Sequence, residues 1–211
     1  MKKREWMIVV AAALVAVAPR AARAQVYYLY PGAPTVTRDD AALGGTVGFG
    51  DDIVRLLGYG RFNINPVADL GLEIVLDETG GKWRVGAGAD VKYGIVPEGK
   101  TMPVDLSLDA GIGFQTGGGV TNLDVPVGGL ISRPLQLDNG RVVVPYGGLY
   151  LVFRHASWDL PPGVPGDDSN TDLDVELRLG ASISVFTNGD AFVNLHIGED
   201  FMFFLGYNAN I

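Results

Sequence analysis

His155 and Ser157 are the two residues of this sequence whose types and spacing are best suited to chemistry. They belong to a segment of alternating character, and residues i and i+2 of a β-strand point to the same face. The imidazole of His155 could therefore take the proton of the Ser157 hydroxyl and make it a nucleophile for acyl transfer. The other histidine, His196, alternates with Asn194 and Gly198 and is expected on the polar face of its own strand.

A serine nucleophile of this kind also needs an acidic group that orients the histidine. Asp174 and Glu176 fall on the polar face of the next predicted strand, and Asp167 and Asp168 lie in the loop between the two strands. The sequence therefore does not identify which carboxylate would be the third member of a catalytic triad. The chain has no G-x-S-x-G and no H-E-x-x-H motif, and we predict neither a metal site nor a cofactor.

Residues 83–93 show most clearly how a strand of this chain separates its apolar and polar side chains. Every odd position is apolar or aromatic and every even position is charged or glycine, which is the period of a β-strand. Trp83 and Tyr93 mark the two ends of its apolar face, separated by roughly 33 Å of strand. Tilted by about 40°, this strand spans roughly 25 Å, the height of the apolar band on a transmembrane barrel. We predict aromatic belts at both membrane interfaces, with Trp83, Tyr93, Phe114 and Tyr207 as members.

Similar alternating segments fill the rest of the chain, and turn-forming residues separate them. We predict strands at residues 42–50, 53–64, 69–78, 82–95, 103–116, 120–133, 141–157, 172–186, 190–198 and 201–211. The segment 172–186 alternates for longer than the five or six residues that are about usual in soluble sheets. The predicted fold class is all-β, an antiparallel up-and-down transmembrane β-barrel of about eight to ten strands.

Residues 1–24 are expected to be a cleaved signal peptide. A basic start at residues 2–4 precedes an apolar stretch that is shorter than the about 20 residues of a membrane helix, and residues 22–24 form a small-x-small cleavage site. Residues 25–41 would then be an extended N-terminal arm that could plug the lumen. Residues 42–211 would be the barrel domain.

The composition excludes several classes of function. Removing the predicted signal takes away five of the 16 basic and one of the 24 acidic residues, so the net charge changes from −8 to −12. Such an acidic product is poorly suited to nucleic acid, whose phosphates need a basic surface. The chain has no cysteine, which excludes disulfides, thiol chemistry and a lipoprotein anchor.

The polar faces of the predicted strands would meet inside the barrel. A barrel of this size is just wide enough for side chains to fill, and charges buried there must be paired. We predict an ionic network that holds the barrel shut, formed by Glu73, Arg84, Asp90, Lys92, Asp105, Asp109, Arg154, Glu176 and Arg178. The excess of acid leaves a narrow cation-preferring pore as an alternative.

The signal peptide and the alternating strands together resemble the small outer-membrane β-barrel proteins of Gram-negative bacteria. The chain ends with alternating Phe203, Leu205, Tyr207, Ala209 and Ile211, similar to the terminal strand that the assembly machinery of such barrels reads, although the family usually ends on Phe or Trp. The resemblance implies a location in the outer membrane, contact with its lipids, and the barrel-assembly machinery as a partner during biogenesis.

The His155–Ser157 pair looks like the His-x-Ser pair of outer-membrane lipid A 3-O-deacylases, which are small barrels with a lipid-facing serine site. This resemblance would make His155 the base and Ser157 the nucleophile. The two patterns diverge after the serine, where the family continues with Asn-Ala and this chain has Trp158-Asp159.

We therefore predict an outer-membrane β-barrel protein with a structural or surface-interaction role and a side-chain-filled lumen. Three alternatives stay open: a small cation-preferring porin, a lipid-modifying hydrolase that uses His155 and Ser157, and a soluble exported barrel that binds an apolar ligand. We expect a protein that is not an enzyme. Its predicted partners are the lipids and the assembly machinery, with no nucleic acid and with the partner of its external loops unassigned.

Overall fold

The computed structural model describes residues 32–33, 41–95, 104–159 and 169–211, and this part of the chain is built from β-strands. The strands are β1 (Ala41–Gly50), β2 (Ile53–Asn65), β3 (Ala68–Thr79), β4 (Lys82–Gly94), β5 (Asp105–Gly117), β6 (Val120–Ser132), β7 (Leu135–Gln136), β8 (Val142–Trp158), β9 (Ser169–Phe186), β10 (Gly189–Ile197) and β11 (Phe201–Asn210). Among these residues, no helix is long and apolar enough to cross a membrane. The predicted signal peptide, residues 1–24, lies outside the described residues.

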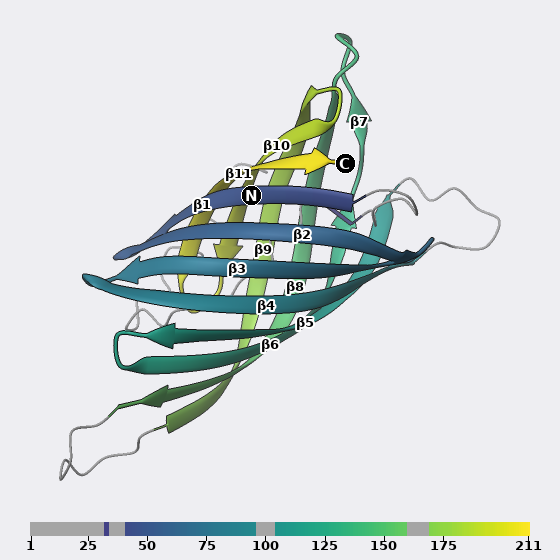
Figure 1. Cartoon of the computed structure of the whole chain (residues 1–211). Helices are drawn as coiled ribbons and strands as arrows, with labels where there is room; N and C mark the ends of the chain where they lie inside the picture. Colours follow the sequence, from purple (N-terminus) through teal and green to yellow (C-terminus); the bar gives the residue numbers. More distant parts are fainter. Residues whose placement is uncertain (1–31, 34–40, 96–103, 160–168) are drawn as a thin grey trace, which may run out of the picture.

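The strands close into a barrel. Every strand except β7 pairs antiparallel with its two neighbours in the ring, and β1 pairs with β11, so the first and last strands join. Two backbone hydrogen bonds between Ala41 and Ile211 extend this seam. The short β7 pairs only with β8, while β6 pairs with β8 directly, so the closed ring contains ten strands (Figure 1). The prediction of an antiparallel up-and-down barrel is confirmed, at the upper end of the predicted strand number.

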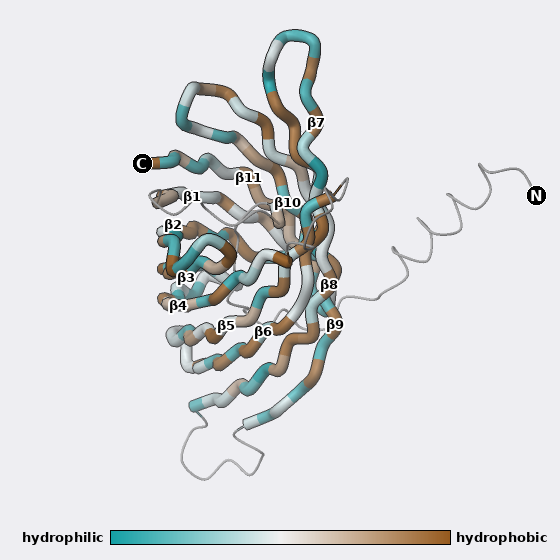
Figure 2. The backbone as a smooth tube through the Cα atoms, turned by 90° about the vertical axis from the view of Figure 1, so that its right-hand side faces the viewer, coloured by the Kyte–Doolittle hydropathy of each residue, from teal (hydrophilic) through white to brown (hydrophobic). Residues whose placement is uncertain are grey.

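The two faces of each strand differ in the way that period two predicts. Apolar side chains point outward, as Ile74 (69% exposed) and Leu173 (67% exposed) illustrate, whereas charged side chains such as Asp77 and Lys92 point inward and are 0% exposed. Hydrophobic and hydrophilic positions accordingly alternate along the strands (Figure 2). This is the reverse of the soluble alternative, in which an apolar ligand would sit among inward-facing apolar residues.

The four predicted interfacial aromatics all lie on the outer surface, each at least 40% exposed. Trp83 and Tyr93 lie near opposite ends of β4. In the strand register Phe114 faces Ala87, which places it toward the Trp83 end, and Tyr207 lies three residues before the end of β11. The two aromatic belts stay a prediction.

The barrel has a terminal end, where β1 begins and β11 ends, and an opposite end. At the terminal end the connection from β6 to β8 contains the short strand β7. β7 pairs with the first residues of β8, and the resulting hairpin projects beyond the ring. A turn closes it, with the Gly140 amide donating to the Leu137 carbonyl at 2.9 Å and Gly140 at φ +80°. The positive φ explains the glycine at this position.

Candidate functional site

Arg61 on β2 is the shared cation of two buried ion pairs in the lumen. Its Nη1 donates a hydrogen bond to Asp69 Oδ1 on β3, and its Nη2 donates to Asp90 Oδ2 on β4. All three side chains are buried. The guanidinium of Arg61 has several N–H donors in one plane, so it can bind both carboxylates at once. Each carboxylate loses water on burial, and the charge-assisted hydrogen bond from Arg61 offsets part of that cost.

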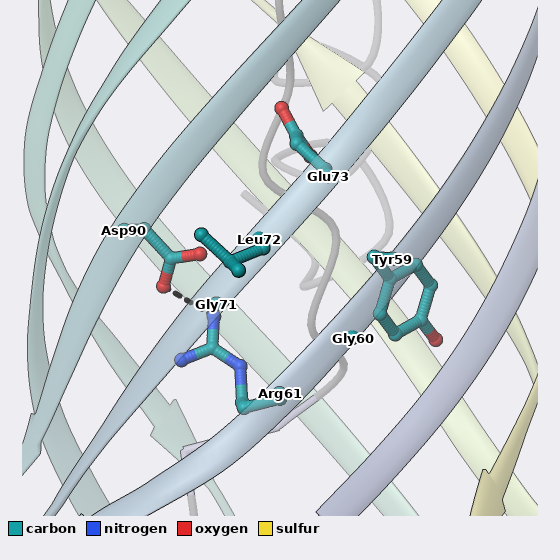
Figure 3. A pocket seen from close by; sticks show the side chains of 7 residues that line it. All are labelled: Tyr59, Gly60, Arg61, Gly71, Leu72, Glu73 and Asp90. Atoms are coloured by element: carbon teal, nitrogen blue, oxygen red, sulfur yellow. Dashed lines mark hydrogen bonds and ion pairs between the residues drawn. The ribbon is translucent and has the colours of Figure 1, made fainter.

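Gly71 allows Arg61 to reach across a whole strand. The strand register places Arg61, Gly71 and Asp90 in one row on β2, β3 and β4. A Cβ atom at Gly71 would collide with Arg61 Nη2 and Asp90 Oδ1. The pair therefore passes over the bare backbone of this glycine (Figure 3). Glu73, two residues further along β3, points away from the pair and has no hydrogen-bond partner for Oε1 among the described residues.

A chain of polar contacts continues from β4 and β5 across to β10. Lys92 lies opposite Asp69 and Asp109 in the register of its two neighbouring strands. Asp109 accepts a hydrogen bond from the Tyr150 hydroxyl at 3.0 Å, and the guanidinium carbon of Arg178 lies 3.8 Å from the Tyr150 ring centroid. A cation over a buried ring is an attractive arrangement. We call Arg61, Asp69, Asp90, Lys92, Asp109, Tyr150 and Arg178, with Glu176 and His196, the luminal network.

On β9 and β10 the luminal network ends at His196. Arg178 Nε donates to Glu176 Oε1 at 2.6 Å, and the same carboxylate oxygen lies 3.1 Å from His196 Nδ1. Nε2 of His196 is 3.0 Å from Asn194 Nδ2. His196 is buried in the lumen, the polar side on which its alternation places it.

Two further ion-pair groups lie toward the opposite end of the barrel. Arg154 contacts Asp124, Asp174 and Glu199 at 3.2, 2.8 and 2.7 Å. Glu199 belongs to the connection between β10 and β11, so this contact ties that connection to the wall. Arg55 pairs with Asp77 at 2.6 Å, with both side chains 0% exposed.

The residues predicted for the ionic network overlap only in part with the residues that form ion pairs in the lumen. Seven of them face the lumen and are buried: Glu73, Asp90, Lys92, Asp109, Arg154, Glu176 and Arg178. Arg84 and Asp105 are half-buried and lie near strand ends. Sequence reasoning missed Arg55, Arg61, Asp69 and Tyr150, although Arg55 and Arg61 share a face of β2. Their signal was weak because Ile53, Leu57 and Tyr59 occupy the same inward face.

The lumen is less polar than the sequence predicts. An apolar cluster of Ile53, Leu57, Val75, Met202 and Phe204 lies inside the ring on β2, β3 and β11. Beside it, a cavity of about 10 Å³ lies between Tyr59, Arg61, Glu73 and Asp90, which is room for about one water molecule.

His155 and Ser157 lie on the outer face of β8, near the opposite end. His155 Nδ1 is 2.9 Å from Thr171 Oγ1 on β9, its direct partner across the strands. Among the described residues, no hydrogen bond joins His155 to Ser157. A threonine hydroxyl can fix the orientation of the ring, but it brings no charge to stabilise an imidazolium.

None of the described carboxylates completes a triad there. Asp174 and Glu176 turn into the lumen and pair with Arg154 and Arg178. Asp167 and Asp168 lie outside the described residues. Within the described chain, no group of three His, Cys, Asp or Glu residues could hold a metal ion.

Residues 94–101 match the G-x-x-x-x-G-K-T pattern of a P-loop. A P-loop needs a strand before the pattern and a helix after it, because the helix N-terminus helps to cradle the phosphates. Here the pattern falls between β4 and β5, two antiparallel neighbours in one sheet. Most of it, residues 96–101, lies outside the described residues. The pattern therefore carries no assignment of a nucleotide site.

Comparisons with protein-family models and with curated proteins give no match. Among solved structures, the chain is similar to the β domain of the Bordetella autotransporter BrkA, with 10% identity over 81% of this chain and 97% of that chain and a TM-score of 0.47. It is similar to the KdgM porin, with 13% identity over 80% of this chain and 98% of that chain and a TM-score of 0.37. A de novo designed transmembrane β-barrel gives 12% identity over 84% of this chain and 100% of that chain, with a TM-score of 0.40. The barrel assignment itself comes from the strand pairing and burial of this chain.

Proposed function

We propose that this protein is an outer-membrane β-barrel with a structural or surface-interaction role, whose lumen is closed by its own side chains. The observation that carries the proposal is the apolar outer surface. Large hydrophobic side chains are exposed on the ten strands of the ring, including Leu56, Ile74, Leu108, Leu149 and Leu173. Soluble proteins rarely expose contiguous apolar patches larger than a few hundred Å², whereas lipid is the favourable neighbour for such a band.

The buried side chains of the lumen support a structural role over a transport role. Arg55, Lys92, Arg154 and Tyr150 are among the largest side chains that are fully buried, and they come from strands around the ring. Arg55, Arg154 and Tyr150 form ion pairs or hydrogen bonds with nearby strands of the ring, and Lys92 donates a hydrogen bond to the carbonyl oxygen of Gly32. Moving an ion through this region would require breaking contacts that compensate for buried charge, which is costly.

Cell fractionation tests the proposed location. We expect the protein in the outer-membrane fraction, released by detergent and resistant to extraction with carbonate. Its band on a gel should also shift when the sample is boiled, as expected for a closed barrel that stays folded until it is heated. Recovery of the folded protein in the soluble fraction after osmotic shock would contradict the proposal.

The contacts of His155 do not favour a hydrolase, and a substitution can test this. We expect cells that carry Ser157→Ala to contain lipid A of the same mass as cells with the unchanged protein, because among the described residues no charged group orients His155. Thr121→Ala, which alters the neighbouring position on β6, is the matched control. Mass spectrometry of lipid A makes the measurement. If the unchanged protein removes an acyl chain and only Ser157→Ala abolishes this, the hydrolase alternative is correct.

A further inference from the structure

The buried side chains of the described barrel contain more acids than bases. Seven carboxyl groups are buried, but only five lysine and arginine side chains are buried with them. The carboxyl groups belong to Asp69, Glu73, Asp77, Asp90, Asp109, Asp124 and Glu176, and the cations belong to Arg55, Arg61, Lys92, Arg154 and Arg178. A buried charge without compensation is costly, so each of these acids needs a polar partner or a proton.

Six of the seven carboxyl groups have a polar partner in the structure. Five of them form ion pairs with arginine, which are Arg55–Asp77, Arg61–Asp69, Arg61–Asp90, Arg154–Asp124 and Arg178–Glu176. Asp109 accepts a hydrogen bond from the Tyr150 hydroxyl. Glu73 is the exception, because among the described residues no ion pair or hydrogen bond reaches its carboxyl group and its Oε1 is buried.

The strands on either side of Glu73 explain why it lacks a partner. Its direct neighbours in the register are Tyr59 on β2 and Gly88 on β4. Gly88 has no side chain. The Tyr59 hydroxyl reaches toward β1, since a Cβ atom at Gly44 would lie 2.2 Å from it, and β1 is on the side of β2 away from β3.

The charged groups around Glu73 are committed to other contacts. Arg55 and Arg61 on β2, Arg178 on β9 and Asp90 on β4 all act on its charge. Each arginine already binds another carboxylate, and Asp90 is itself an acid. The Glu73 side chain is directed away from the pair of Arg61 and Asp90 (Figure 3).

A proton suits this position better than a metal ion. The cavity beside Glu73 has a volume of about 10 Å³, which is too small for a hydrated cation. Within the described chain, no three His, Cys, Asp or Glu side chains come together as metal ligands. Keeping a proton at pH 7 costs a factor of about 500 in population relative to a glutamate in water, whose pKa is about 4.3. An uncompensated charge in the interior costs more than this factor.

We propose that Glu73 is a proton-binding site of the barrel interior, where it is a neutral acid at pH 7, and that loss of its proton at higher pH destabilises the barrel. Loss of the proton would place a further negative charge at the cavity that Asp90 also lines, although Asp90 already shares Arg61 with Asp69. The inference goes beyond the proposed function and concerns the interior alone. It therefore holds or fails independently of the membrane location.

Infrared difference spectra at pH 7 test the proton directly, in micelles of a detergent without carbonyl groups. We expect the spectrum of the unchanged protein minus that of Glu73→Gln to contain the C=O band of a neutral carboxylic acid. The matched control is Glu176→Gln, because Glu176 is the other buried glutamate of the described residues and pairs with Arg178. Its difference spectrum should contain carboxylate bands instead. Carboxylate bands in the Glu73 difference spectrum would overturn the proposal.

The pH dependence of stability gives a second test. Above pH 5 an unfolded chain releases the Glu73 proton while the folded barrel keeps it, so raising the pH favours unfolding. Between pH 5 and pH 7 we expect the unfolding equilibrium constant of the unchanged protein to rise about tenfold per pH unit relative to that of Glu73→Gln. Urea unfolding in micelles measures both proteins. Parallel pH curves, or a Glu73→Gln variant that does not fold, would show that the carboxyl group is charged in the native barrel.

Discussion

Replacing Arg61 with methionine is expected to lower the free energy of unfolding of the barrel by about 3–5 kcal/mol. The substitution keeps most of the volume but leaves Asp69 and Asp90 buried without their shared cation. An uncompensated charge in a desolvated interior is one of the few single changes with an effect of this size. Urea unfolding in detergent micelles, followed by the mobility of the folded band on unheated gels, measures the change.

Two control variants test whether the loss comes from the buried ion pairs of Arg61. Arg141 is exposed in the hairpin that follows β7, and Arg141→Met should change the free energy by no more than about 0.5 kcal/mol. Adding Asp69→Asn and Asp90→Asn to Arg61→Met should recover part of the loss, because neutral amides then replace the two carboxylates that lost Arg61. A loss below about 1 kcal/mol for Arg61→Met alone would mean that the luminal network does not hold the barrel together.

Placing an arginine at Ile74 is expected to destabilise the barrel in lipid by about 2–4 kcal/mol. Ile74 is 69% exposed on the outer face and lies in the middle of β3, so its side chain should sit near the centre of the membrane. The cost falls toward the interfaces. Ile64→Arg, near the end of β2, should therefore cost only about 0–1 kcal/mol. Folding equilibria in lipid vesicles measure both variants.

The same pair of variants separates a membrane barrel from a soluble one. On a water-exposed surface, Ile74→Arg would change the free energy of unfolding by about 0.5 kcal/mol or less. The difference between positions 74 and 64 would then vanish. Equal, small effects would contradict the lipid-facing assignment.

The strands could be predicted from the sequence because each carries its own periodic pattern. Residues 83–93 alternate without interruption, and β4 has the inward and outward positions that this alternation gives. If the alternation were shifted by one residue, Asp90 and Lys92 would point outward. The sequence pattern therefore defines which side chains of the strand face the lumen, as well as where the strand lies. The same holds for Leu173 and its neighbours on β9.

The pairing inside the lumen could not be predicted in the same way. Arg61 meets Asp90 only because β2, β3 and β4 align in one register and because Gly71 leaves the path clear. Neither condition is visible in the local pattern. Tyr150 was missed because an aromatic residue on a polar face carries no charge signal, although Asp109 and Arg178 both engage it. The apolar cluster around Phe204 was missed because a wholly polar lumen was expected.

A nitroxide scan along residues 70–77 of β3 in lipid vesicles tests most directly whether the apolar outer face lies in lipid, with one cysteine introduced at a time into the cysteine-free chain. We expect strong collision with oxygen, which dissolves in the lipid, at positions 70, 72, 74 and 76. Positions 71, 73, 75 and 77 should be protected, because they face the filled lumen. Maxima at the odd positions, or preferential collision of the even positions with a water-soluble nickel reagent, would show that the apolar face is not in lipid.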